Sequence, residues 1–190
     1  MALTMPNRSP TSPVMDWLLV ACLIGLVVAA RLFPHAPNFT PVVAAGLFAG
    51  MVLRSRTLAL IVPVAAMLIS DLIMGFEDWR IRVVIYAALV LPVILGIWGQ
   101  RFRPVLALLP LALTSSLLFF VVSNFAVWAF SGMYALDLGG LVRCYVLALP
   151  FLQNMVIGDI LWTAVLFGSW WLVQFWFPAA QRAASPVSSR

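Results

Sequence analysis

The chain has 190 residues, of which 64% are hydrophobic and only 9% are charged, and its formal net charge is +5. A soluble domain is about 45–50% apolar and about 25% charged, so this composition excludes a water-soluble globular protein and indicates one that crosses a lipid bilayer several times. The positive charge suits anionic lipid headgroups better than nucleic acid, and no nucleic-acid partner is expected.

Six apolar runs follow a polar N-terminal stretch, and most approach the ~20 residues that a helix needs to cross a bilayer. They are Trp17–Phe33, Pro41–Leu53, Leu58–Met74, Val83–Trp98, Val105–Val122 and Met155–Phe177. The second run is short, which is compatible with a tilted helix, a re-entrant segment or a span extended by its neighbours. The predicted fold is an all-α membrane protein, with one domain of six transmembrane helices over residues 16–178 between disordered tails at 1–15 and 179–190.

The first run has the length of a signal-peptide core, and Val28-Ala29-Ala30 resembles a cleavage site. However, its apolar character continues through Leu32 and Phe33, and the stretch before it is long and weakly basic. These features favour a retained membrane span.

The positions of the arginines predict the orientation, because cytoplasmic loops carry the excess of basic residues. With six spans, one side holds Arg8, Arg54, Arg56, Arg101, Arg103, Arg182 and Arg190, and the other holds Arg31, Arg80, Arg82 and Arg143. The first side is therefore predicted to be cytoplasmic and to hold both termini. Three loops then face outward, and the third is predicted to be long, from Ser123 to Asn154.

The single histidine lies in the first outward loop, Arg31-Leu-Phe-Pro-His35-Ala-Pro-Asn38-Phe-Thr-Pro41. Its three prolines prevent a continuous helix, because proline lacks an N–H and clashes with the preceding turn. We expect this loop to form a stiff wall of an outward-facing pocket that the third outer loop closes. The alternative for His35 is an ordinary hydrogen-bonded loop residue.

The histidine and the two cysteines, Cys22 and Cys144, match neither a disulfide framework nor the spacing of a metal site. No metal or other cofactor is therefore predicted.

Two acidic residues, Asp71 and Asp159, lie within or at the end of apolar runs. An acid at the centre of a membrane helix costs about 2.5–3.5 kcal/mol on insertion scales, so such residues are candidates for function. The alternative is a structural ion pair of either acid with Arg31 or Arg143, because both acids are expected near the outer interface, where the cost is smaller.

Polar and aromatic residues after the fifth run complete the predicted ligand site. Asn124 offers hydrogen-bond donors and acceptors, and Trp128 and Tyr134 offer flat apolar faces, a mixture that suits a small and partly polar ligand. The alternative is a capped helix end with Trp128 at the membrane interface. The predicted ligand-binding residues are Arg31, His35, Asn38, Asp71, Asn124, Trp128, Tyr134, Asn154 and Asp159, and none is predicted to be catalytic.

Small residues recur at a spacing of four in the first two runs, as Ala21, Gly25 and Ala29 and as Gly46 and Gly50. Such residues let membrane helices approach closely, either for docking another subunit or for packing this bundle. The sequence also lacks the phosphate-binding motif G-x-x-x-x-G-K-[ST] and the zinc-protease motif H-E-x-x-H, so neither chemistry is expected.

The arrangement of these residues resembles an uncharacterised bacterial integral membrane family over Arg31 to Gly168. That family looks related to the substrate-binding S-components of energy-coupling-factor vitamin transporters. The residues that carry the resemblance are Arg31, Pro34-His35, Asn38-Phe39, Pro41, Ala45-Gly46-Leu47-Phe48-Ala49-Gly50, Pro63, Ala65, Met67-Leu68-Ile69-Ser70-Asp71, Ser123-Asn124-Phe125, Val127-Trp128, Met133-Tyr134, Gly140-Leu141, Cys144-Tyr145, Pro150-Phe151, Asn154 and Gly158-Asp159.

The resemblance implies a six-helix S-component fold in the bacterial inner membrane, with an outward-facing pocket for a vitamin-like small molecule. It also implies that Ala21, Gly25 and Ala29 dock onto a membrane coupling subunit driven by ATPases. Some relatives of S-components act alone, including a cobalamin carrier whose cysteine ligates cobalt. This chain has no cysteine in its second outer loop, Gly75 to Arg82, which argues against a corrinoid ligand.

Three functions remain open from the sequence. The leading hypothesis is a membrane substrate-binding protein for uptake, which is not an enzyme. The second is an intramembrane enzyme that uses Asp71, Asp159 and His35, which requires these groups to lie within mutual reach. The third is an interaction subunit without a ligand, which requires a packed outer side.

Overall fold

The structure is a computed structural model, and it describes residues 13–75, 78–102 and 104–176. These residues form helices and contain no strand. The helices are α1 (Pro13–Leu32), α2 (Val42–Val52), α3 (Arg56–Met74), α4 (Trp79–Ala88), α5 (Val90–Gly99), α6 (Pro104–Phe130) and α7 (Leu138–Trp176). Helices α4 and α5 form one apolar stretch, Trp79–Gly99. It is interrupted at Leu89 because Pro92 has no N–H to donate to the preceding turn.

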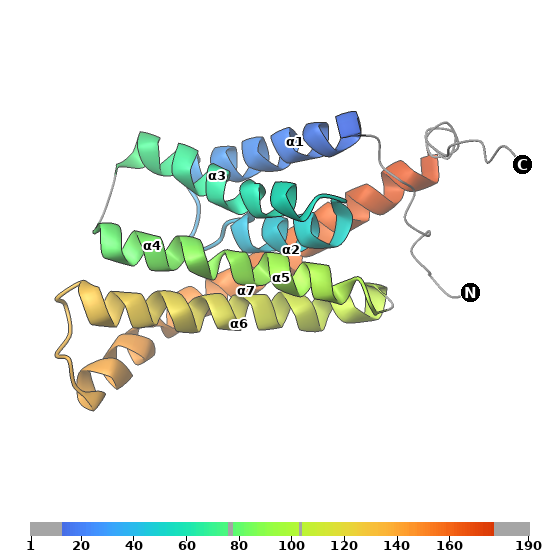
Figure 1. The fold of residues 1–190 in the computed structure, drawn as a ribbon. Helices are drawn as coiled ribbons and strands as arrows, with labels where there is room; N and C mark the ends of the chain where they lie inside the picture. The colour runs from blue at the N-terminus through green and yellow to red at the C-terminus, as the bar shows by residue number, and fades with distance from the viewer. Residues whose placement is uncertain (1–12, 76–77, 103, 177–190) are drawn as a thin grey trace, which may run out of the picture.

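Within the described residues, five stretches are long and apolar enough to cross a membrane, namely α1, α3, α4 with α5, α6 and α7. The chain is therefore a multi-pass membrane protein. Helix α2 has 11 residues, which is about 16 Å of helix against about 30 Å of bilayer core. Figure 1 shows α2 among the other helices, nearer the end of the bundle where α1 begins. Helix α2 alone is too short to cross the bilayer, and a sixth span at this position stays a prediction.

Figure 1 places the start of α1 and the end of α7 at one end of the bundle, which we call the terminal end. The junctions α2–α3 and α5–α6, with Arg54, Arg56 and Arg101, lie at the terminal end as well. The opposite end, which we call the cavity end, holds the end of α1, the start of α4 and the α6–α7 loop. This grouping of arginines follows the sequence prediction, and which end faces the cytoplasm stays a prediction.

The third outer loop is much shorter than predicted. Helix α6 continues to Phe130 and α7 begins at Leu138, so only residues 131–137 separate them. The prediction of a long lid from Ser123 to Asn154 was wrong because Pro150 lies inside α7, and membrane helices tolerate proline when neighbouring groups satisfy the freed carbonyl. The predicted sixth span is the second part of this one helix.

Only part of the predicted N-terminal tail lies within the residues that the structure describes. Residues 1–12 and 179–190 lie outside the described residues, as do Arg8, Arg103, Arg182 and Arg190. Helix α1 begins at Pro13, so the last three residues of the predicted N-terminal tail are helical. Val20, Leu23 and Val27 of α1 belong to the main hydrophobic core, which makes this helix an integral part of the bundle.

Glycines bring α2 and α5 into close contact. A Cβ on Gly50 would lie 2.3 Å from the Val93 carbonyl oxygen, and one on Gly96 would lie 2.3 Å from the Leu47 carbonyl oxygen. Only glycine fits at this spacing, so the small residues of α2 pack this bundle. On α1, by contrast, Ala21, Gly25 and Ala29 are exposed, and no described atom comes within 4 Å of a Cβ built on Gly25.

Candidate functional site

Two adjoining cavities lie toward the cavity end of the bundle. The larger has a volume of about 670 Å³ and the smaller about 140 Å³. They share five lining residues, namely Arg31, Asn38, Met67, Met74 and Phe119. Their walls come from the α1–α2 loop, α3, α4, α6 and α7, so segments far apart in the sequence converge on one space.

The proline-rich loop lines both cavities and is fixed by local contacts. The Phe39 N–H donates to the Ala36 carbonyl at 3.0 Å, and Asn38 adopts a left-handed conformation with φ of 63°, which asparagine tolerates better than most residues. Phe39 packs on Gly158 of α7, where an added Cβ would lie 3.2 Å from the phenylalanine ring. The loop is therefore anchored to α7 beside Asp159.

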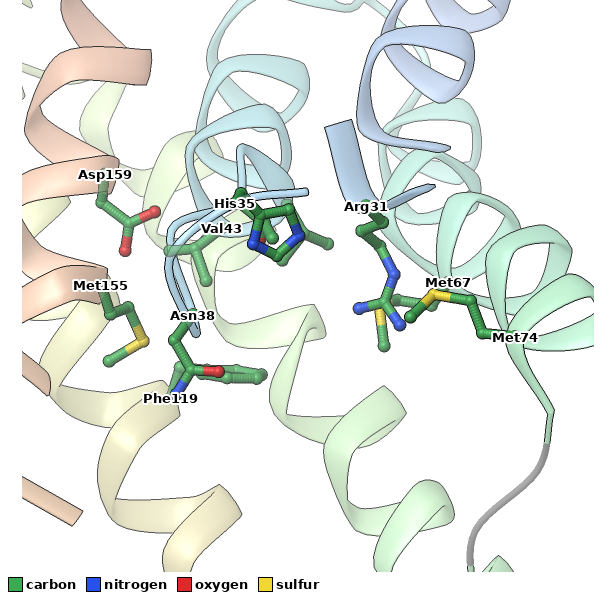
Figure 2. Close-up of a pocket in the computed structure, with 11 residues that line it drawn as sticks. Arg31, His35, Asn38, Val43, Met67, Met74, Phe119, Met155 and Asp159 are labelled. Atoms are coloured by element: carbon green, nitrogen blue, oxygen red, sulfur yellow. The ribbon is translucent and has the colours of Figure 1, made fainter. Parts of the chain in front are cut away.

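His35 and Asn38 stand on the part of this loop that lies between α7 and Arg31. Figure 2 shows them opposite Asp159 and Met155, with Arg31 on the other side beside Met67 and Met74. The His35 Nδ1 lies 2.8 Å from the Ala36 carbonyl oxygen. His35 therefore makes a hydrogen bond within the loop, which is the alternative role that the sequence analysis gave it. The histidine still lines the smaller cavity.

Asp71 sits near the end of α3 and binds two arginines. Arg31 Nη2 donates to Asp71 Oδ1 at 2.7 Å, Arg82 Nη1 pairs with Oδ2, and the Tyr86 hydroxyl donates to Oδ2 at 2.8 Å. This arrangement confirms the alternative of an ion pair with Arg31. A carboxylate that holds two guanidinium groups and a hydroxyl has most of its acceptor sites occupied, which makes it a poor general base.

Asp159 is buried in the centre of α7 and lines the smaller cavity. The Ser116 hydroxyl of α6 donates to its Oδ2 at 2.6 Å, and the backbone amide of Ala44 in the first turn of α2 adds a favourable interaction. Its Oδ1 has no hydrogen-bond partner among the described residues. The ion pair of Asp159 with Arg143 that the sequence offered is not found among the described residues. The unpartnered Oδ1 leaves one unused acceptor in the smaller cavity.

The remaining predicted residues divide into two groups. Asn124 and Tyr134 line the larger cavity, and the Asn124 side chain donates to the Phe120 carbonyl at 2.9 Å. Trp128 and Asn154 line neither cavity. The Trp128 indole N–H instead donates to the Ala135 carbonyl at 2.9 Å, which ties α6 to the loop before α7.

Sequence reasoning missed three polar residues of the site. Arg82 and Tyr86 were not recognised as partners of Asp71, although their spacing of four places both on one face of α4. Ser116 was not considered, although Thr114-Ser115-Ser116 interrupts an apolar run and hydroxyl side chains in membrane helices often bond to neighbouring helices.

The described residues offer no centre for a metal ion. No group of three or more His, Cys, Asp or Glu side chains comes together within the described ranges. Cys22 and Cys144 are both free, the first exposed and the second buried. The cavities themselves combine hydrogen-bonding groups, charged side chains and apolar walls, a mixture that small-molecule sites also show.

Comparison with known proteins gives one match. No curated protein and no solved structure matches the chain. A family model described as a family of unknown function, DUF6580, matches residues 11–180. This match covers the whole helical bundle, and the chain therefore belongs to the DUF6580 family.

Proposed function

We propose that this protein is a membrane substrate-binding protein, similar to the S-components of energy-coupling-factor transporters, that serves uptake of a vitamin-like small molecule across a bacterial inner membrane. The observation that carries the proposal is the cavity of about 670 Å³. Small-molecule sites occupy about 300–1,000 Å³ and combine apolar walls with a few polar groups. The same mixture lines this cavity, which in the proposed orientation faces outward.

The proposed roles of the residues follow from where they lie. His35, Asn38 and Asn124 line the cavities and would hydrogen-bond the ligand, and Tyr134 would stack on it. Asp71 holds the arginines in place, while Asp159 offers a free acceptor. Ligand contacts by Trp128 and Asn154 gain no support from this arrangement, because neither residue lines a cavity.

The exposed small residues of α1 support a docking role. Ala21, Gly25 and Ala29 are exposed on a helix whose opposite face packs into the core. This free strip lets another helix approach closely. In the proposal it docks onto a membrane coupling subunit driven by ATPases.

The two alternatives gain less support. An enzyme with Asp71 as a general base conflicts with the ion pairs that occupy this carboxylate. An interaction subunit without a ligand predicts a packed cavity end, whereas residues there surround a cavity.

Uptake measurements on single variants test the proposal. The molecule extracted from the purified protein would be supplied in labelled form to cells that express the wild type, His35→Ala or Asn124→Ala. We expect each variant to lower uptake, because each removes a hydrogen-bonding group from a cavity wall. Gln153→Ala is the matched control, since Gln153 is exposed on α7 and lines neither cavity. Uptake that is unchanged in both test variants would refute the assignment.

A further inference from the structure

The smaller cavity has a buried acid in its wall. Asp159 is only 1% exposed and lines this cavity, and Figure 2 shows its carboxylate on the side of α7 nearer His35. Its Oδ2 accepts the Ser116 hydroxyl at 2.6 Å, whereas its Oδ1 has no hydrogen-bond partner among the described residues. Each oxygen of an ionised carboxyl group accepts about two hydrogen bonds, so Oδ1 leaves room for a donor from a bound molecule.

The charge of Asp159 lacks a full partner as well. Within the described residues, no arginine forms an ion pair with it. The first turn of α2 lies beside it at Ala44, but a helix end supplies only about half an elementary charge. Arg31 lines the same cavity, yet its guanidinium binds Asp71 at 2.7 Å and lies beyond His35 in Figure 2. Ionised groups inside membrane proteins normally find a partner of opposite sign, and a cationic ligand group would supply it here.

The proline-rich loop adds a second acceptor across the cavity from Asp159. The His35 Nδ1 lies 2.8 Å from the Ala36 carbonyl oxygen. Because a carbonyl oxygen only accepts, Nδ1 carries a proton in this bond, and Nε2 of the neutral ring is then an acceptor. Asn38 and Thr40 bring an amide and a hydroxyl to the same wall. Acceptors on two sides of one space suit a group with several N–H donors.

The size and the other walls of the smaller cavity limit what surrounds this group. Its volume is about 140 Å³, and a cavity of about 150 Å³ holds a benzene ring. Val43, Phe119 and Met155 give it apolar walls. The space therefore accepts a polar group that is attached to a small apolar ring or chain.

We infer that the ligand carries a cationic N–H group, an amine or an amidine, which binds between Asp159 and His35 in the smaller cavity. The rest of the ligand then occupies the adjoining larger cavity. The inference rests on the proposed function, since it names the ligand class of the same site. A water-soluble amine and the headgroup of an aminophospholipid share this chemistry.

Benzamidine and benzamide form a matched pair of probes, because they have nearly the same shape and only benzamidine is positively charged at neutral pH. Thermal unfolding of the purified protein in a neutral detergent would be followed with each probe at equal ionic strength. For a dissociation constant of ~1 mM, ~10 mM benzamidine raises the ratio of folded to unfolded protein about elevenfold. We expect benzamidine to raise the melting temperature and benzamide to leave it nearly unchanged. Equal effects of the two probes, including no effect of either, overturn the inference.

Variants locate the effect at the acid. Asp159→Asn keeps the shape of the side chain and removes its charge, so it should abolish the difference between the probes. Asp78→Asn makes the same chemical change at a residue that lines neither cavity, and it should preserve the difference. A preference for benzamidine that survives in Asp159→Asn overturns the inference.

The single histidine of the chain gives a test that needs no variant, should Asp159→Asn fail to fold. Because the chain has one histidine, protein that is purified without a histidine tag and labelled with ¹⁵N in histidine shows the imidazole signals of His35 alone. Benzamidine should shift these signals, and benzamide should leave them nearly unchanged. If benzamidine raises the melting temperature without shifting them, it binds elsewhere and the inference is overturned.

Mass spectrometry of the molecules that co-purify separates this inference from the proposed function. A water-soluble molecule with a basic nitrogen supports both. An aminophospholipid supports the cation site and contradicts uptake of a small molecule. A metabolite without a basic nitrogen leaves the uptake function intact and overturns the cation site. The absence of any bound molecule contradicts the uptake function, and the probes still decide on the cation site.

Discussion

Asp71 connects α1, α3 and α4 through its carboxylate, because Arg31, Arg82 and Tyr86 all bind it. We predict that Asp71→Ala lowers the free energy of unfolding by about 3–5 kcal/mol, since it leaves buried charges without their partner. Thermal and denaturant unfolding in detergent measure this loss. Asp78→Asn is the control, because it removes the charge of an exposed pair with Arg80 and keeps a side-chain oxygen that caps α4, and it should change stability little. Equal stability of Asp71→Ala and the wild type would contradict the structural role of the cluster.

Asp159 differs from Asp71 because one of its oxygens has no hydrogen-bond partner among the described residues. We predict that Asp159→Asn folds with unchanged or higher stability, since it removes an incompletely satisfied charge, yet binds the extracted ligand more weakly. Ser116→Ala should instead lower stability by about 1–3 kcal/mol, because it leaves the buried carboxylate without its hydroxyl donor. Measuring the melting temperature and the ligand affinity of both variants tests this difference in their effects. If Asp159→Asn is strongly destabilised and still binds the ligand, the role of Asp159 is purely structural.

At this scale, the sequence reveals buried charges but only part of their pairing, since it offered Arg31 as a partner of Asp71 and did not offer Arg82. Asp71 and Asp159 stand out because acids are costly within apolar runs. That Arg31 and Arg82 share one carboxylate depends on how α1, α3 and α4 pack, and no local pattern records it. The predicted contact of Trp128 with a ligand stays a prediction, and in the structure its indole N–H donates to the Ala135 carbonyl.

At the scale of the elements, glycines allow helices α2 and α5 to pack closely against each other. We predict that Gly50→Ala or Gly96→Ala destabilises the protein by about 1–3 kcal/mol or more, because the added methyl group would meet a backbone carbonyl that has little room to move. Gly168→Ala, where an added Cβ meets no described atom within 4 Å, is the matched control. Thermal unfolding of the three variants measures the difference. If all three melt alike, the close contact of α2 and α5 is not present.

The apolar runs predicted most of the helices well, and the largest difference lies around Pro150, where a helix replaces the predicted loop. Three prolines end the helix before α2, as expected, because they fall within eight residues. Pro150 alone does not interrupt α7, so the same residue type has a different outcome. The difference arises because the cost of one missing hydrogen bond is offset by packing along a long helix.

At the scale of the whole molecule, two groups of loops lie at opposite ends of one helical bundle (Figure 1). We predict that the cavity end faces outward. In a variant that lacks Cys22 and Cys144, a cysteine introduced at Met133 should react with a membrane-impermeant maleimide added to intact cells. A cysteine introduced at Ser55, at the terminal end, should react only after the cells are opened. The reverse pattern would show that the cavity faces the cytoplasm and would contradict uptake from outside.

The central claim is that the cavity holds a small molecule, and its most direct measurement is mass spectrometry of the protein purified from the membranes of its native host. The wild type should carry one defined small molecule, and His35→Ala and Asn124→Ala should carry less of it, because both residues line the cavities. Gln153→Ala should carry the wild-type amount. A wild-type protein that carries no small molecule, or carries one that the two cavity variants retain in full, would contradict the account.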